Sequence, residues 1–458
     1  MPKLLINIPV EASTHKYPSM FPYPLLLLKI KELNDVLVDL VFETFKKNVE
    51  AKKRILDDII KNINSGDAVQ YSQIIVNCGE YAPDGFYSKW VEYFLKNINK
   101  SVALMGPYAT IFKERIQEIG EKTKLTHTIL DTNYDTYNVV IPDEMLEKYP
   151  KVGTFPKANM RITLGCCRQC NMCPVQLLYN CTYQFFDINE SIEKVRYYYG
   201  KGVRFINFID DNISANIPML INFLNRLKAE QLKEMSYSVQ EGFELSAFYN
   251  EDLCALLKEL KFSDIKVGVE NIKEDFLIKI NKPKRNINDI ETAIVNLRKY
   301  KLKPKLFFLI ADFQSKEDIL DNLKFFSRLG VDLRVNIIRQ YEGMRLPKFE
   351  ALISQQELKH LKALAYAVAY MTTVQKFDIF QENAWDKYAQ LKGYTLYFKK
   401  EDNSHTLEHG KQYFGFKTIK WITAVERMLS QKYSTNVSID YDIEDKKIRS
   451  ITIGDQKC

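Results

Sequence analysis

An alternation of apolar strands and amphipathic helices between residues 161 and 338 most constrains how this chain of 458 residues can fold. Apolar runs separated by helical stretches of 10–15 residues are typical of βαβ units in a parallel sheet. Strands are expected at residues 161–164, 203–209, 235–239, 265–271, 304–310 and 332–338, with helices at 191–199, 217–229, 251–260, 288–300 and 316–329. Six such strands predict a partial (β/α)6 TIM-like barrel, whose chemistry gathers at the carboxyl ends of the strands.

Three cysteines follow the first of these strands, at Cys166, Cys170 and Cys173, with the spacing C-x3-C-x2-C. Structural zinc sites usually have four ligands, often arranged as two CxxC pairs, and no second pair follows here. Soft thiolates suit an iron–sulfur cluster, and three of them leave one iron of a four-iron cluster open to a substrate or cofactor. A zinc site or simple burial of the thiols are the alternatives.

Polar residues stand at the ends of two later strands. Asp210, Asp211 and Asn212 follow the second predicted strand, and Glu270 and Asn271 end the fourth. Carboxylates at these positions could accept hydrogen bonds from a bound ligand. The alternative is structural, because Asp and Asn also cap the segments that follow strands.

The cysteine spacing, with the apolar Met172 directly before the last cysteine, resembles the signature loop of the radical S-adenosylmethionine (radical SAM) enzymes. The resemblance covers residues 157–345 and implies a [4Fe–4S] cluster held by the three cysteines. In that family the open iron binds SAM, and one electron from the cluster cleaves SAM to a 5′-deoxyadenosyl radical. Residues 311–313 depart from the family, which often has a Gly-rich turn at that position.

The same resemblance implies roles for the polar strand ends. One of Asp210, Asp211 and Asn212 is expected to contact the amino group of SAM. Glu270 or Asn271 is expected to contact its ribose.

Residues 1–140 predict a second α/β domain, of the doubly wound, Rossmann-like type. Its strands are expected at residues 3–8, 73–77 and 101–105, with helices at 25–63 and 86–98. Ligands of such folds bind beyond the strand ends, and the small residues there, Gly106 and Pro107 among them, allow a cofactor to approach.

Two segments of this domain resemble the cobalamin-binding domain that precedes the radical SAM core in one large subclass. They are Tyr23-Pro24-Leu25-Leu26 and the turn Gly106-Pro107-Tyr108-Ala109-Thr110. The subclass ordinarily has a Gly-Gly-Pro-His-Ala turn, so this turn lacks one Gly and the His. None of the five histidines lies in an Asp-x-His-x-x-Gly motif, so no histidine is expected to bind cobalt.

The remaining segments complete the predicted domain organisation. Residues 141–158 are polar and contain three prolines, which predicts a linker between the first domain and the barrel at 159–345. Residues 346–458 predict an α+β extension that shapes the substrate pocket. Its helices are expected at 355–371 and 418–432 and its strands at 436–442 and 447–453.

Composition limits the partners and the compartment. A net charge of +7 is mild for this length, and no run of 5–8 basic residues indicates nucleic-acid binding. The apolar run at residues 25–28 is too short to span a bilayer, and the first residues lack the apolar region of a signal peptide. Eight cysteines, several around one loop, suit a reducing compartment, so a cytoplasmic enzyme is expected.

Three functions are compatible with the sequence. The first is a cobalamin-dependent radical SAM methyltransferase that acts on an unactivated carbon. The second is a cobalamin-free radical SAM enzyme that abstracts hydrogen and then rearranges, cyclises or oxidises its substrate. The third is a non-catalytic Fe–S or zinc protein. The two enzymatic hypotheses imply a low-potential electron donor of the flavodoxin or ferredoxin type and a small-molecule or peptide substrate.

Overall fold

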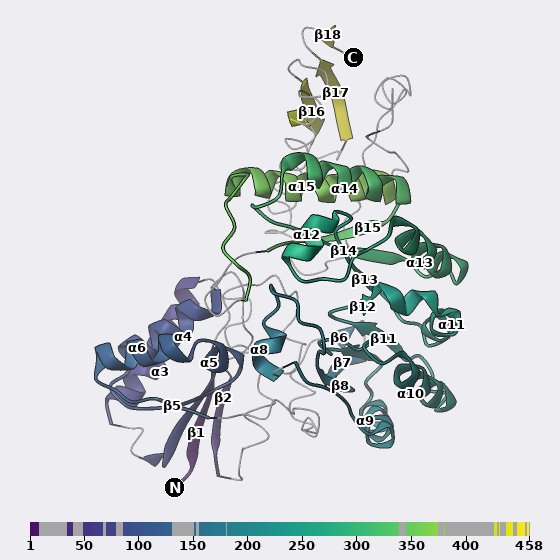
Figure 1. The fold of residues 1–458 in the computed structure, drawn as a ribbon. Helices are drawn as coiled ribbons and strands as arrows, with labels where there is room; N and C mark the ends of the chain where they lie inside the picture. The colour runs from purple at the N-terminus through teal and green to yellow at the C-terminus, as the bar shows by residue number, and fades with distance from the viewer. Residues whose placement is uncertain are drawn as a thin grey trace. The chain divides into compact units, whose positions relative to one another are not determined.

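The computed structural model describes most of the chain between residues 1 and 373 and short segments beyond it (Figure 1). The described residues are 1–8, 34–39, 49–66, 70–78, 86–130, 151–152, 155–179, 181–338, 345–373, 380, 426–427, 430, 437–442, 447–453 and 456–457. The chain forms two compact units, one of residues 1–265 with 339–346 and the other of 266–338 with 347–458. The fold is mixed α/β with parallel sheets, as predicted, whereas the predicted domain boundaries stay a prediction.

The N-terminal sheet has five parallel strands in the order β2-β1-β3-β4-β5. These are β1 (Lys3–Asn7), β2 (Val36–Asp39), β3 (Gln73–Asn77), β4 (Ala103–Met105) and β5 (Thr128–Ile129). The helices of this region are α3 (Val49–Asn64), α4 (Phe86–Asn97), α5 (Pro107–Ile111) and α6 (Lys113–Thr123). The strand order reverses direction between β1 and β3, and open α/β sheets bind ligands at such a switch point.

Alternate residues of these strands pack on opposite faces of the sheet. Leu4 and Ile6 join a core with Leu56, Ile60 and Phe94 of the covering helices. Leu5, between them, belongs to a second buried cluster with Ile75, Ala103 and Met105, against which Leu164, Leu178 and Tyr179 pack. Both faces are therefore covered, as a parallel sheet requires.

The predicted helix at residues 25–63 is wrong at its centre. Val36–Asp39 is strand β2, which pairs with β1, and the described helix α3 begins only at Val49. The Asp35 carboxylate accepts a hydrogen bond from the backbone N–H of Lys3 at 2.7 Å. Pairing with a neighbouring strand thus overrides the local helical preference.

The first unit holds a second sheet, in which β10 (Phe205–Phe208) lies between β7 (Phe155–Met160) and β11 (Ser236–Val239), parallel to both. β6 (Lys151–Val152) pairs antiparallel with β7. The connecting helices are α9 (Ile188–Gly200), α10 (Ile217–Ala229) and α11 (Glu251–Glu259), and the short strand β12 is Phe243–Glu244.

The first strand of this alternation differs from its prediction. The strand that joins the parallel sheet is β7, which ends at Met160, and the predicted strand at 161–164 is replaced by β8 (Thr163–Gly165). β8 pairs antiparallel with β9 (Tyr183–Phe185) and so forms a hairpin beside the sheet.

The second unit contains β13 (Ile265–Glu270), β14 (Pro304–Ile310) and β15 (Asp332–Ile337), with β14 and β15 parallel. Its helices are α12 (Glu274–Lys279), α13 (Ile287–Lys299), α14 (Lys316–Leu329) and α15 (Gln355–Thr373). The Tyr366 hydroxyl of α15 bonds the backbone of Val335 in β15.

The predicted C-terminal strands are confirmed as an antiparallel sheet. It consists of β16 (Val437–Asp442), β17 (Lys447–Ile453) and β18 (Gln456–Lys457). Most of the predicted helix at 418–432 lies outside the described residues.

Candidate functional site

The three cysteines lie on the loop of the β8–β9 hairpin, which also carries the short helix α8 (Val175–Tyr179). Cys170 is buried, while Cys166 and Cys173 are half-buried. The loop begins at Gly165, whose φ of 75° favours glycine and whose Cβ would collide with the carbonyl oxygen of Thr182. The hairpin therefore closes tightly at its base and projects the cysteine segment.

The Gln176 side chain organises the backbone of this loop. It is 3% exposed and its amide donates to the carbonyl oxygens of Cys170 and Cys173, the latter at 3.3 Å. Its own oxygen accepts a hydrogen bond of 2.9 Å from Arg345. The sequence analysis did not identify Gln176 as a candidate site residue, although Gln176 lies only three residues after the last cysteine.

Asp210 fixes the segment between β7 and β8. Its Oδ1 accepts hydrogen bonds from the backbone N–H groups of Ile162 and Thr163, at 2.9 and 2.5 Å, and from the Thr163 hydroxyl at 2.7 Å. The residue is fully buried, and burial raises the pKa of its carboxyl to about 6 despite these bonds. Its predicted contact with SAM stays a prediction.

Asp211 lies beside Arg161 at the base of the loop. Its Oδ2 accepts from Arg161 Nη1 at 3.0 Å and from the backbone N–H of Gly165 at 3.3 Å. The same guanidinium nitrogen donates to the Tyr179 hydroxyl at 3.0 Å. Burial lowers the pKa of Arg161, but the neighbouring Asp211 carboxylate outweighs it with the help of Tyr179 and Asp210, so this pKa lies well above its usual range and the guanidinium stays charged.

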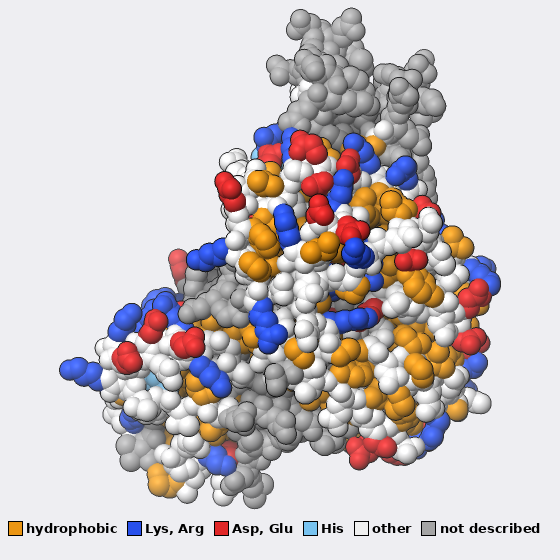
Figure 2. Space-filling model, in the orientation of Figure 1, with side chains coloured by type: hydrophobic (Ala, Val, Ile, Leu, Met, Phe, Trp, Pro, Cys, Tyr) orange, Lys and Arg blue, Asp and Glu red, His pale blue; other side chains and the backbone are white. Residues whose placement is uncertain are grey.

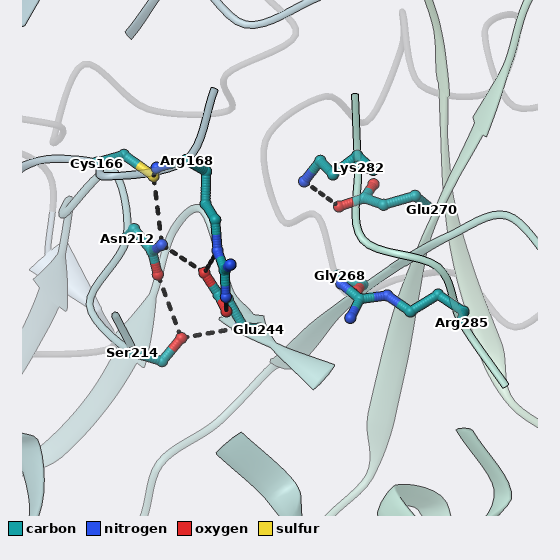
Figure 3. A network of polar contacts seen from close by, with 9 residues as sticks. All are labelled: Cys166, Arg168, Asn212, Ser214, Glu244, Gly268, Glu270, Lys282 and Arg285. Carbon is teal, nitrogen blue, oxygen red and sulfur yellow. Dashed lines mark hydrogen bonds and ion pairs between the residues drawn. The ribbon is translucent and has the colours of Figure 1, made fainter. Parts of the chain in front are cut away.

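Asn212 contacts a cysteine directly (Figure 3). Its Nδ2 lies 3.3 Å from Cys166 Sγ and 2.7 Å from Glu244 Oε1. Glu244 in turn holds Arg168 of the cysteine loop through two bonds of 2.9 and 2.6 Å. Sequence reasoning missed Glu244, which comes from the short strand β12 after β11.

These residues fit a [4Fe–4S] cluster. Three thiols lie on one loop, and Cys166 Sγ receives N–H groups from Asn212 and from the backbone of Arg168, the latter at 3.4 Å. Such donors stabilise the negative charge that cluster sulfurs carry. Within the described ranges no three His, Cys, Asp or Glu side chains converge on a single metal ion. A [4Fe–4S] cluster does not need such a group, because each cysteine would bind a different iron.

Glu270 and Asn271 belong to the second unit; Glu270 ends β13 and Asn271 follows it. Glu270 has a φ of 70° and its Oε1 lies 2.9 Å from Lys282 Nζ. Asn271 is fully buried, donates to the Leu309 carbonyl at 3.2 Å and accepts from Asn322 of α14 at 2.9 Å. Asn271 thus ties β13 to β14 and α14, while the SAM contacts predicted for both residues stay predictions.

Gly106 follows β4 and precedes α5, which begins at Pro107. Its φ is 99°, and a Cβ there would stand 2.6 Å from Asn77 Oδ1 and 3.3 Å from the backbone of Cys78. Glycine is thus required for the turn to pack on the end of β3, a reason that sequence reasoning did not foresee. Residues 9 and 79, at the other two predicted strand ends, lie outside the described residues.

Three cysteines outside the Cys166–Cys173 segment are also described. Cys78 and Cys254 are fully buried, as is common for free cysteines, which behave as small hydrophobes. Cys181 is half-buried beside Gln176 and has a φ of 58°.

Comparison with known proteins identifies similar sequences. Residues 160–326 match the Radical SAM superfamily. An uncharacterized methyltransferase of Pyrococcus horikoshii is 25% identical over 207 residues, which are 44% of this chain and 43% of that protein. A bacteriochlorophyllide d C-12(1)-methyltransferase of Chlorobaculum tepidum is 22% identical over 199 residues, 42% of this chain and 41% of that protein. The chain thus matches less than half the length of these relatives.

The fold is similar to that of a solved structure. This is the radical S-adenosylmethionine methyltransferase TsrM from Kitasatospora setae, with cobalamin and a [4Fe–4S] cluster bound. The TM-score is 0.54 and the sequence identity 14%, and the likeness covers 76% of this chain and 77% of that one.

Proposed function

We propose that this chain is a radical SAM methyltransferase that uses cobalamin held by residues 1–140 and acts on an unactivated carbon, because residues 160–326 match the Radical SAM superfamily. The Rossmann-like assignment of that region and the pocket-shaping role of residues 346–458 are part of the proposal. The methyltransferase relatives and the likeness to TsrM support it.

One observation carries the proposal. α5, which follows the Gly106 turn, contacts α8, which begins two residues after Cys173. Leu178 and Tyr179 of α8 also pack on the face of the N-terminal sheet formed by Leu5, Ile75 and Met105. A cofactor at the end of β4 would therefore lie near the cysteine loop, as methyl transfer requires.

The chain's own residues supply binding and orientation. When bound, the cluster and SAM supply radical chemistry, and cobalamin supplies a transferable methyl group. Cys166, Cys170 and Cys173 hold the cluster, and Gln176 and Asp210 fix the backbone on either side of it.

The polar strand ends take the SAM contacts in this proposal. Asp211 offers its carboxylate to the SAM amino group, since Asp210 has no exposed surface. Glu270 would contact the ribose, and Asn271 would hold the end of β13 in place through its hydrogen bond to the Leu309 carbonyl.

The proposal includes the partners. A low-potential electron donor of the flavodoxin or ferredoxin type reduces the cluster, and the substrate is a small molecule or a peptide in the cytoplasm. No helix in the described part of the chain has the length and apolarity to cross a membrane. On the face in Figure 2, basic side chains lie among acidic and apolar ones rather than in one patch, so nothing on this face favours nucleic acid.

A cobalamin-free radical SAM enzyme is the second candidate. The observation that favours it is the Gly106 turn, where glycine is explained by packing against Asn77 and Cys78 without any ligand. A non-catalytic metal protein is not retained, because the matching family and the relatives are enzymes.

Reconstitution with hydroxocobalamin distinguishes the two candidates. The protein is loaded anaerobically with iron, sulfide and hydroxocobalamin and passed over a gel-filtration column. Corrinoid absorbance should co-elute with the protein, and also with Cys170→Ala, which lacks a cluster ligand but keeps the N-terminal sheet. If the corrinoid elutes free of protein while the cluster and SAM cleavage are intact, the cobalamin-dependent methyltransferase is refuted and the cobalamin-free enzyme becomes the proposed function.

A further inference from the structure

The amide of Asn212 has a fixed orientation toward the cysteine loop. Its Nδ2 lies 2.7 Å from Glu244 Oε1, and the paired carboxylate of Glu244 can only accept hydrogen bonds. The atom that faces Glu244 must therefore be the nitrogen. One amide hydrogen goes to Glu244, and the other is free to point at Cys166 Sγ, 3.3 Å away.

Several contacts hold this amide in place (Figure 3). Asn212 is 7% exposed, and the Ser214 hydroxyl lies 3.4 Å from its Oδ1. Ser214 also accepts the backbone N–H of Glu244 at 2.8 Å. Arg168 of the cysteine loop forms an ion pair with Glu244. Asn212, Glu244, Arg168 and Cys166 therefore form a closed ring of contacts, which holds Asn212 Nδ2 close to Cys166 Sγ.

From this ring we propose that Asn212 is a positioning residue that sets the reduction potential of the cluster through its N–H···S hydrogen bond to Cys166. The inference rests on the proposed function, in which Cys166 binds a cluster iron. Reduction adds one negative charge, which is shared with the ligand sulfurs, so a donated N–H stabilises the reduced state more than the oxidised one. Removing the donor then makes the cluster harder to reduce.

An EPR-monitored redox titration of the reconstituted protein tests this. Asn212→Leu removes the donor at similar size. At the wild-type midpoint potential, we expect the ratio of reduced to oxidised cluster to be about threefold to tenfold lower in Asn212→Leu than in wild type. This change corresponds to the net free energy of one hydrogen bond. A tenfold fall is 59 mV for a one-electron couple.

Asn207→Leu is the matched control. Asn207 is a buried asparagine in β10, the strand that precedes Asn212, and its amide donates to Asn159 and Gln240 at 3.1 and 3.2 Å, not to sulfur. Its loss should leave the midpoint potential unchanged. An unchanged potential in Asn212→Leu with wild-type iron content, or an equal shift in both variants, overturns the inference.

If Asn212→Leu binds less iron than wild type, a second measurement tests the hydrogen bond from Asn212 to Cys166. Pulsed EPR on the reduced cluster, with only asparagine side-chain amides labelled with 15N, should show a coupled nitrogen. The measurement uses the Asn171→Ser variant, which removes the asparagine between Cys170 and Cys173. No coupled 15N overturns the inference. If instead the wild-type protein binds no four-iron cluster, the proposed function fails, which is a different outcome.

Discussion

Replacing Asp210 should expose its structural role. In Asp210→Ala, the N–H groups of Ile162 and Thr163 and the Thr163 hydroxyl lose their acceptor in a fully buried place. Each buried donor left without a partner costs about 1–3 kcal/mol, so local opening should become easier by about 4 kcal/mol. Asp210→Asn keeps an acceptor oxygen for the same three donors and should lose little.

Hydrogen–deuterium exchange of peptides spanning residues 160–165 measures this opening. A loss of about 4 kcal/mol corresponds to roughly 10³-fold faster exchange of the two amides, provided that they exchange through this opening. Peptides of α14 in the second unit serve as an internal control and should be unaffected. Exchange in Asp210→Ala within threefold of wild type would refute the reasoning.

Three further predictions follow from single contacts. Gly165→Ala should lower both the melting temperature and the iron content, because its Cβ meets the Thr182 carbonyl, whereas Gly200→Ala, with open space around it, should not; equal losses in both would contradict this. Gln176→Leu should slow iron uptake several-fold by releasing the carbonyls of two cysteines, and wild-type uptake would argue against that role. Burial raises the pKa of Asp210 from 3.8 to about 6, so the folded state favours the protonated carboxyl. The free energy of unfolding is therefore highest below pH 4 and falls as the pH rises to 6, because the buried carboxyl loses its proton. Wild-type stability should thus fall by about 3 kcal/mol relative to Asp210→Asn over that window, and parallel curves would exclude the shift.

Strand and helix periodicity predicted the described parts of residues 188–338 closely. The helix at 217–229, the strand at 304–310 and the helix at 316–329 have their predicted bounds, because burial on one helical face or along a buried strand leaves a strong pattern. β2 escaped prediction because its four residues are fixed by pairing with β1, a contact that local pattern does not contain.

For the candidate site residues, the sequence indicated which strand ends they follow but not what they contact. The strand-end rule located Asp210 and Asn212, yet not that one bonds the backbone of Thr163 and the other a cysteine sulfur. Glu244 escaped because a turn separates it from β11. Its partner Arg168 is 76 residues away in the sequence, and local sequence patterns do not show contacts between residues so far apart.

The central claim, radical SAM chemistry at Cys166, Cys170 and Cys173, is tested most directly by anaerobic turnover of SAM. Reconstituted wild-type protein with a low-potential reductant should form 5′-deoxyadenosine from SAM, and Cys170→Ala should form none. Equal turnover of SAM by Cys170→Ala, with wild-type iron content, would contradict the account.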